Sequence, residues 1–501
     1  MHFLISLIIP FISIFLQSYP RFFNKYFGVD VWTRLLEIEH VKKTHHKIPG
    51  EIKDGFIIEG MFDYPIIFPF LFSFFPKKFL LNIQGFVSPF FDALQNILVF
   101  YITFSLTKNL YIALISQVIY SLIPIIPIEN SYLTPRSLGY LVFTLAFYPV
   151  FLFHINHNIY LLILSLFFTA ALFLTHRFAL QSLIFISLFF SIVDRSPIYL
   201  LNIILGFIIV VALTKGFYLR VLKGHLYNIY FWVINYKYRF AHQIYGIRSS
   251  KKMDWVGKAY NLLSFFSPIF ILAGNIWALS SVFYLFLYFQ RIPDFPLNII
   301  YFKMSLWIIF FYIFGSIVLK IKRLIPIGEG QRYMEMASTP SAVLSSIIFF
   351  YFWQKYGVIV GILFVAILAG NLFFILFLQI KGIIADKNRS LTSDLKEAYR
   401  FINSMAGTPR IICIPHQITT MTVYNTKADV LVNADNPGLM RIQEVYPILK
   451  KSISFLQKKY SLDYLLLRES FAKLEDLKVQ NGKIVFRSGD VALIKLANKT
   501  S

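Results

Sequence analysis

The dominant pattern along the chain is a succession of long apolar stretches with almost no charge. Each is roughly 17 or more residues long, enough to cross about 30 Å of hydrocarbon as a helix. Gly and Pro occur inside the stretches, as is common in membrane helices. We therefore expect about eleven transmembrane helices, at 3–19, 88–107, 110–127, 138–155, 158–174, 178–193, 196–213, 261–289, 298–319, 337–353 and 357–379.

Two long segments outside the apolar stretches interrupt this pattern. The segment 20–87 contains a helical pattern at 31–43 and a Pro- and Phe-rich run at 64–75, so it predicts a first outer loop with interfacial helices. The segment 215–260 interleaves Lys and Arg with Tyr, Phe and Trp. Basic and aromatic residues together are typical of a helix lying on the membrane surface.

The composition changes after about residue 381, where the apolar stretches end. The remaining chain alternates short helical and strand patterns, which predicts a membrane domain at 1–380 followed by a small soluble α/β domain at 384–501. No P-loop, dinucleotide-binding glycine pattern or zinc motif occurs in it. The expected helices are 394–405 and 437–460, and the expected strands are 410–415, 464–467, 483–487 and 491–496.

Composition supports a membrane protein and excludes several other classes. The chain is 57% hydrophobic and only 15% charged, whereas soluble chains have about 45–50% and about 25%. Its net charge of +23 favours anionic headgroups of the lipid bilayer or a phosphorylated lipid substrate as partners. It carries no nucleic-acid-binding motif, and we expect no nucleic acid partner. The single cysteine, Cys413, excludes an intramolecular disulfide.

The first outer loop carries a carboxylate where a membrane enzyme would need one. Asp30 lies between Gly28 and Trp32, shortly after the first apolar stretch. At the membrane surface this carboxylate can act as a general base toward a hydroxyl, or can hold a divalent cation such as Mg²⁺ or Mn²⁺. The alternative is structural, since Asp is a preferred N-cap residue and Asp30 can cap the following helix.

Two further acidic positions are candidates. Asp63 and Tyr64 precede Pro65 in the same outer loop, in a segment that also reads as an amphipathic interfacial run. Asp92 stands near the start of the second apolar stretch. An ionisable group inside a membrane is costly and is a functional hypothesis by default, but at the end of a span it can simply face water.

Three polar clusters fall on one face of the membrane when the crossings are counted. They surround Arg136, the pair His176–Arg177, and Glu329 with Arg332. Arginine suits phosphate recognition through paired N–H donors, and glycines beside Arg332 at a helix start would add free backbone N–H groups. The same count places Asp30 on this face. Each arginine taken alone is also explained by a lipid headgroup contact.

These features together resemble the GT-C class of glycosyltransferases, polytopic enzymes that use polyprenyl-phosphate-linked sugars. The resemblance extends in pattern to the enzymes of the protein mannosyltransferase and oligosaccharyltransferase type. It covers most of the chain as an ordered set of short motifs. The matching segments are 28–32, 63–65, 135–139, 175–178 and 328–333, together with the C-terminal soluble domain.

The resemblance implies an inverting glycosyltransferase in which Asp30 is the catalytic carboxylate. It implies that Arg332, and with it Arg136, contacts the lipid phosphate of a polyprenyl-phosphate-linked donor, and that the acceptor is a glycan, lipid or protein at the outer face. The chain departs from the oligosaccharyltransferases by lacking Trp-Trp-Asp in the soluble domain and a second acidic residue adjacent to Asp30. Transfer of a single sugar is therefore expected, and a metal requirement stays open.

Two other functions remain as alternatives. A transporter or lipid flippase would show ionisable residues in mid-span and an internal repeat, and a cell-envelope assembly protein would not need Asp30. The odd number of spans predicts a cytoplasmic N-terminus and an extracytoplasmic C-terminal domain. The basic segment 215–260 favours the cytoplasm by the positive-inside rule, so its side of the membrane stays open.

Overall fold

The computed structural model describes residues 2–52, 55–129, 132–239, 241–244, 268–432, 440–479 and 482–496, and single residues between 255 and 262. Contacts divide the chain into two compact units. The first unit comprises Met1–Lys25, Ile83–Gly216 and Met253–Ala385. The second unit comprises Tyr26–Asn82, Phe217–Lys252 and Asp386–Ser501. The two segments expected to lie outside the membrane thus cluster with the C-terminal fold.

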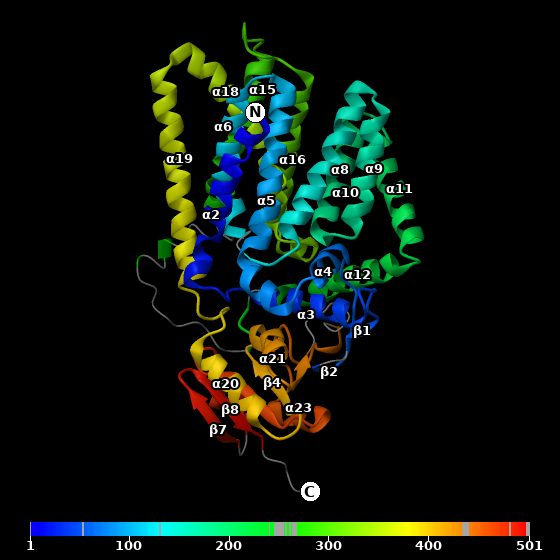
Figure 1. Cartoon of the computed structure of the whole chain (residues 1–501), viewed down its shortest axis with the longest axis vertical. Helices are drawn as coiled ribbons and strands as arrows, with labels where there is room; N and C mark the ends of the chain where they lie inside the picture. Colours follow the sequence, from blue (N-terminus) through cyan, green and yellow to red (C-terminus); the bar gives the residue numbers. More distant parts are fainter. Residues whose placement is uncertain are drawn as a thin grey trace. The chain divides into compact units, whose positions relative to one another are not determined.

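The first unit consists of helices, and its long helices run roughly side by side (Figure 1). They follow the predicted apolar stretches closely, apart from residues between 261 and 267, where most positions lie outside the described part. The helices of ten or more residues are α2 (Ile8–Phe23), α5 (Lys77–Thr107), α6 (Leu110–Ser121), α8 (Arg136–Asn156), α9 (Ile159–Phe173), α10 (Arg177–Val193), α11 (Ile198–Leu213), α15 (Leu279–Phe289), α16 (Ile299–Lys320), α18 (Ser338–Tyr356) and α19 (Val358–Gln379).

The protein is a multi-pass membrane protein. Five described helices are long and apolar enough to cross a bilayer, and six if the bent pair Ile198–Leu213 and Phe217–Tyr238 is one interrupted span. Four shorter apolar helices accompany them. The count of eleven crossings stays a prediction. The five are Leu4–Phe23, Lys77–Thr107, Arg136–Asn156, Ile299–Lys320 and Val358–Ile384.

Polar side chains decide where several of these helices begin and how they associate. Asn109, Asn158 and Asn298 each accept backbone N–H groups as N-caps of α6, α9 and α16. Along α5, the amide of Gln95 donates to Thr144 of α8 and to Thr339 of α18. Lipid gives helices no hydrophobic reason to associate, so such interhelical hydrogen bonds contribute to their packing.

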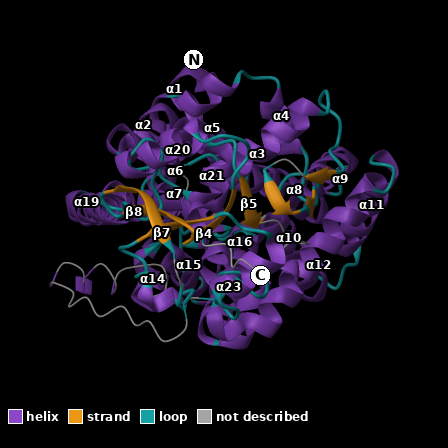
Figure 2. Cartoon of the chain, turned by 90° about the horizontal axis from the view of Figure 1, so that it is seen from below, coloured by secondary structure: helices purple, strands orange, loops and turns teal. Residues whose placement is uncertain are grey.

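The second unit is built around a six-stranded sheet. Its strand order is β2 (Phe56–Ile58), β5 (Asp429–Val432), β4 (Arg410–Ile414), β6 (Tyr464–Arg468), β8 (Val491–Lys495), β7 (Lys483–Ser488). The first four strands are parallel, and β8 and β7 are antiparallel to their neighbours. Figure 2 shows the strands in orange and the helices in purple. An edge strand from the first outer loop therefore completes the C-terminal sheet.

Helices cover both faces of this sheet. On one face lie α20 (Ser393–Ser404) and α21 (Thr419–Asn425), and Cys413 of β4 contacts Thr422 of α21. The hydrophobic core on the other face joins Ile412 and Leu465 to α23 (Ile453–Tyr460) and to Phe231 of α12 (Phe217–Asn235). The helix α3 (Val29–Lys43) of the outer loop packs against α21.

Several local predictions are confirmed and others are wrong. The four expected strands form β4, β6, β7 and β8, whereas β2 and β5 were not predicted. The second apolar helix begins at Lys77, eleven residues before the expected start at 88. The helix expected at 437–460 is wrong. Residues 442–452 are irregular, and α23 begins only after Ser452, whose side chain accepts the N–H of Phe455.

The rest of the segment 20–87 before α5 forms short elements that pair or follow one another along the chain. The strands β1 (Glu51–Ile52) and β3 (Gly60–Met61) pair antiparallel, and α4 (Ile67–Ser73) follows.

On α12, Leu226, Tyr230 and Val233 are exposed while Phe231 is buried. An apolar face thus stays open on the one basic helix of the segment 215–260 that the described residues contain, and its place at a membrane surface remains a proposal.

Candidate functional site

Asp30 lies in the first turn of α3 and is exposed. The N-cap of this helix is Gly28, whose φ of 108° is a conformation that glycine adopts most easily. The interpretation of Asp30 as the N-cap is therefore wrong. Within the described part of the chain no hydrogen bond holds the Asp30 carboxylate. A negative charge at this position still suits the helix dipole.

A fixed positive charge lies one turn after Asp30. Arg34 Nη1 donates to both carboxylate oxygens of Glu37 at 2.6 Å, and its guanidinium stands 3.8 Å from the centre of the Tyr64 ring. Burial by itself lowers the pKa of Arg34, but Glu37, Tyr64 and Asp30 together raise the pKa above its ordinary value. Arg34 therefore stays protonated. Its guanidinium, paired with Glu37 and stacked on the Tyr64 ring, lies one turn after the exposed Asp30 carboxylate.

Asp63 is buried rather than open to a substrate. It packs against Gly224 of α12, where a Cβ would overlap the carboxylate. Glycine at 224 thus allows a close approach between the outer loop and α12. Of the predicted pair, Tyr64 contacts Arg34 directly, whereas Asp63 packs against Gly224.

Asp92 lies fully buried among helices of the first unit. Its two oxygens accept from Gln17 Nε2 at 2.5 Å and from Tyr120 at 2.7 Å. Asp92 therefore joins α5 to α2 and α6. Both hydrogen bonds are of the kind that holds membrane helices together, so the interpretation of Asp92 as an exposed group at the end of a span is wrong.

Arg136, at the start of α8, forms a buried ion pair that the sequence did not predict. Its Nε and Nη2 donate to Glu335 Oε2 at 2.8 and 2.6 Å. Glu335 ends the short helix α17 (Gly330–Glu335) and is fully buried. The motif at 328–333 stops two residues before Glu335, which was therefore missed. A carboxylate in an apolar stretch of sequence was the signal that could have identified it.

His176 and Arg177 stand at the start of α10. His176 is the N-cap, and its Nδ1 accepts the N–H of Ala179 at 3.2 Å. It also packs on Gly139 of α8, where a Cβ would overlap the histidine. His176 thus has a structural role, and Arg177, the next residue, is partly exposed.

Arg332 and Glu329 form a local pair around α17. Arg332 Nε donates to Glu329 Oε2 at 3.0 Å, and about a third of the Arg332 side chain, 35%, stays exposed. The neighbouring glycines serve packing. A Cβ at Gly330 would overlap the Gly315 carbonyl of α16, and Gly328 has a φ of 137°. The expected phosphate site at a helix start is thus reduced to the arginine, since these glycines are explained by close contacts.

The first unit brings its predicted clusters together. Arg332 lies 5.9 Å from the Phe178 ring, and Phe178 packs on Tyr333 at 4.4 Å. The ion pair of Arg136 and Glu335 joins α17 to α8, and His176 at the start of α10 packs on Gly139 of α8. The starts of α8 and α10 and the short α17 therefore meet, as the count of crossings predicted. Asp30, Asp63 and Tyr64 belong to the second unit, so a convergence of Asp30 with these arginines stays a prediction.

A metal centre finds little support in the side chains. Across the described ranges no three His, Cys, Asp or Glu side chains come together in a way that could hold a metal ion. Asp30, which was predicted to act as a general base or to hold a cation, lies one turn before Arg34 on α3. We derive no chemical step from a metal.

Comparison with known proteins identifies the fold. No protein-family model matches the sequence, and no curated protein matches it either. Solved structures do match. The oligosaccharyltransferase AglB from Archaeoglobus fulgidus, in complex with an inhibitory peptide and a dolichol-phosphate, aligns with a TM-score of 0.59 at 10% identity, covering 100% of this chain and 74% of that one.

Two further structures have the same arrangement. ArnT from Cupriavidus metallidurans, bound to undecaprenyl phosphate, aligns with a TM-score of 0.54 at 11% identity over 99% of this chain and 98% of that one. The arabinofuranosyltransferase AftD from Mycobacteria aligns with a TM-score of 0.51 at 11% identity over 99% of this chain and 41% of that one. The chain therefore has the fold of the GT-C enzymes over its whole length, which confirms the family resemblance at the level of fold.

Proposed function

We propose that the protein is a membrane glycosyltransferase of the GT-C type. It transfers one sugar from a polyprenyl-phosphate-linked donor to a glycan, lipid or protein acceptor. The observation that carries this proposal is the likeness in fold, over nearly the whole chain, to proteins whose names and bound molecules include a glycosyl transfer and a polyprenyl phosphate. Fold alone does not fix function, so the residues must carry the chemistry.

In the proposed reaction Asp30 is the general base. It takes the proton of the acceptor hydroxyl, and the acceptor oxygen forms a bond to the anomeric carbon of the sugar. The bond from that carbon to the phosphate oxygen breaks, and the polyprenyl phosphate leaves with the electron pair. Displacement from the opposite face inverts the anomeric centre. The exposure of Asp30 supports this role, because a base must reach its proton within hydrogen-bond distance.

The leaving phosphate needs positive charge where its own charge develops, which is usually the largest catalytic contribution. Arg332 is the best candidate, since about a third of its side chain, 35%, is exposed. Arg332 also lies 5.9 Å from the ring of Phe178, the residue that follows the partly exposed Arg177. Arg136 ranks lower in the proposal, because Glu335 already accepts two of its N–H groups.

The test is transfer from polyprenyl-phosphate-linked hexoses by the full chain in detergent, with Asp30→Asn as the variant. Asn has the size of Asp but cannot take up the proton, so we expect a loss of about 10²–10⁴-fold in rate with unchanged thermal unfolding. Glu475→Gln, an exposed acidic residue of the same unit, is the matched control and should keep full activity.

Each result has a separate meaning. Full activity of Asp30→Asn removes Asp30 from the mechanism. Activity of that variant that returns on adding Mg²⁺ or Mn²⁺ assigns the carboxylate to cation binding instead of proton transfer. If the wild-type chain transfers none of the hexoses while remaining folded, the proposed function is wrong for this donor class.

The proposal also includes a topology, with the N-terminus in the cytoplasm and the second unit outside. Its motive is that lipid-linked donors present their sugars at one face and that Asp30 must meet them there. A reporter that is active only in the cytoplasm, fused after Lys499, should give no signal. A strong signal would place the second unit inside and contradict the arrangement.

A further inference from the structure

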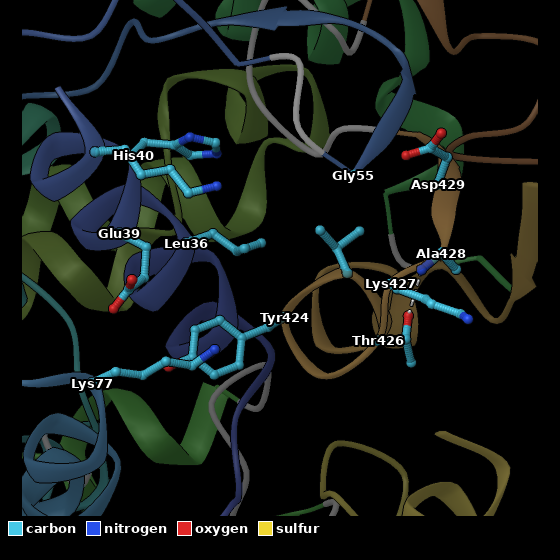
Figure 3. Close-up of a pocket in the computed structure, with 12 residues that line it drawn as sticks. Leu36, Glu39, His40, Gly55, Lys77, Tyr424, Thr426, Lys427, Ala428 and Asp429 are labelled. Atoms are coloured by element: carbon cyan, nitrogen blue, oxygen red, sulfur yellow. Dashed lines mark hydrogen bonds between the residues drawn. The ribbon is translucent and has the colours of Figure 1, made fainter. Parts of the chain in front are cut away.

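A cavity of about 320 Å³ lies inside the second unit, away from Asp30 along the same helix. Its walls come from the C-terminal half of α3, from Gly55 before β2, and from the turn between α21 and β5. Figure 3 shows Leu36, Glu39 and His40 of α3 on one side and Thr426, Lys427 and Asp429 on the other. Its volume is at the small end of the range of ligand sites, about 300–1,000 Å³.

Two of the carboxylates that line the cavity, those of Glu39 and Asp429, are not used by the residues that the structure describes. In the described part of the chain, neither the Glu39 nor the Asp429 carboxylate has a hydrogen bond or an ion pair. The Lys77 ammonium contacts the Tyr424 ring, 4.0 Å from its centre, and pairs with neither acid. Charges of both signs thus face one small space without neutralising one another, which is unusual where they have fixed positions.

Tyr424 is a second and independent sign of a missing partner. The residue is only 8% exposed, and its hydroxyl has no hydrogen-bond partner among the described residues. Burial raises the pKa of Tyr424, so the hydroxyl stays neutral. An unsatisfied buried hydroxyl costs about 1–3 kcal/mol, and in a native structure such a group calls for an explanation, for example a bound molecule or water.

The four groups come from four different elements. Glu39 is on α3, Lys77 begins α5, Tyr424 is on α21, and Asp429 begins β5. Their positions are therefore set by the fold and not by one flexible loop. A ligand here can donate hydrogen bonds to a carboxylate on either side of the cavity, and can accept them from an ammonium and from the Tyr424 hydroxyl.

We propose that this cavity binds a single hexose-sized sugar unit. Hydroxyl groups donate and accept, so a sugar held in the cavity can donate to Glu39 and to Asp429 and accept from Lys77 and from the Tyr424 hydroxyl. The proposal rests on the proposed function in one respect, because it takes the sugar to be a unit of the acceptor or product glycan. It makes the C-terminal fold a glycan-holding site that is separate from the carboxylate of transfer.

Binding, and not transfer, tests this proposal. The full chain in detergent is titrated calorimetrically with the methyl glycosides of glucose, galactose and mannose, and with glycine as a small zwitterion. We expect at least one glycoside to bind and glycine not to bind. Glu39→Gln and Asp429→Asn should each weaken that glycoside at least tenfold, since each loses a charge-assisted hydrogen bond.

The matched control is again Glu475→Gln, which lies outside the cavity and should bind like the wild type. Glycoside affinity unchanged in both cavity variants overturns the proposal, as does tighter binding of glycine or no binding of any glycoside. Because Asp30→Asn leaves the cavity intact, glycoside binding without any sugar transfer would contradict the proposed function alone. Transfer without glycoside binding would contradict the cavity alone.

Discussion

Several carboxylates of the two units differ in whether the protein supplies them with partners. In the helical unit, Asp92 accepts from Gln17 and Tyr120, and Arg136 pairs with Glu335 inside the helix packing. In the α/β unit, Asp30 is exposed, and no described residue holds its carboxylate. The Glu39 and Asp429 carboxylates, which line the cavity of the same unit, also have no partner among the described residues.

A second ion pair in the helical unit shows the same rule. Lys303 Nζ lies 2.9 Å from Asp194, which also accepts from the Tyr199 hydroxyl at 2.6 Å. The cluster joins α16, the end of α10 and α11. None of these three residues was among the predicted site residues.

The difference follows from the cost of a charge in each setting. In hydrocarbon an ionised group without a partner is expensive, so its position is determined by the groups that satisfy it. At a water-facing surface a carboxylate costs little and can stay available. In this protein, a charged group that is buried among the apolar helices therefore has a role in helix packing. For the carboxylates of the second unit that have no partner among the described residues, we propose a role in chemistry.

The largest effect should come from breaking the buried pair. Arg136→Leu removes the guanidinium that pairs with Glu335, and removal of one partner of a buried pair costs about 3–5 kcal/mol. The double variant Arg136→Leu with Glu335→Leu should recover most of this loss, because no charge stays behind. Thermal unfolding in detergent measures both. A single variant as stable as the wild type would show that the pair does not hold the helices.

A smaller effect, on donor binding and not on stability, should come from Arg332. Arg332 is a predicted substrate-binding residue of the helical unit whose side chain is still partly exposed. Arg332→Ala should raise the KM for a polyprenyl-phosphate-linked donor about ten- to hundredfold, as expected from a lost hydrogen bond to a charged group of about 1.5–3 kcal/mol. Arg332→Lys should lose less, since it keeps the charge but not the paired donors. Unchanged donor kinetics in Arg332→Ala would reduce Arg332 to a headgroup contact.

The smallest effect concerns the pH dependence of the second unit. Burial lowers the pKa of His416, which packs 4.6 Å from the Tyr446 ring, to about 4. The unfolded chain takes up this proton near pH 6.5 and the folded chain only near pH 4, so the stabilisation is complete above pH 6.5 and is lost as the pH falls between these values. The loss is about 1–3 kcal/mol. His416→Gln should remove this part of the pH dependence, and an identical pH profile would contradict the assignment.

The sequence predicted the fold well where one physical signal dominates. Long uncharged stretches have few alternatives to membrane helices, so most of these helices were found, although several of their ends were displaced, such as the start of α5. The strands β4, β6 and β8 were found because each is a short run of buried aliphatic residues. The strand β2 was missed because Phe56–Ile58 has only three residues, and its partner β5 lies more than 370 positions later. Local patterns do not report a pairing at that distance.

The candidate site shows the same limit. Asp30 and Arg332 were chosen because their residue types and positions suit the chemistry, and both are at least partly exposed. Asp63 and Asp92 were chosen on the same grounds and are buried. What separates the two pairs is the partner that each side chain meets, such as Gly224 beside Asp63 or Tyr120 beside Asp92. Such partners follow from tertiary packing, which a single sequence does not display.

One measurement compares the two kinds of carboxylate directly. Asp30→Asn and Asp92→Asn remove one negative charge each, and sugar transfer and thermal unfolding are followed for both in the same detergent. The account predicts that Asp30→Asn loses about 10²–10⁴-fold in transfer and unfolds like the wild type. It predicts that Asp92→Asn unfolds at a lower temperature and keeps the activity of its folded fraction. Full transfer by Asp30→Asn, together with a selective loss of transfer by a stable Asp92→Asn, would contradict it.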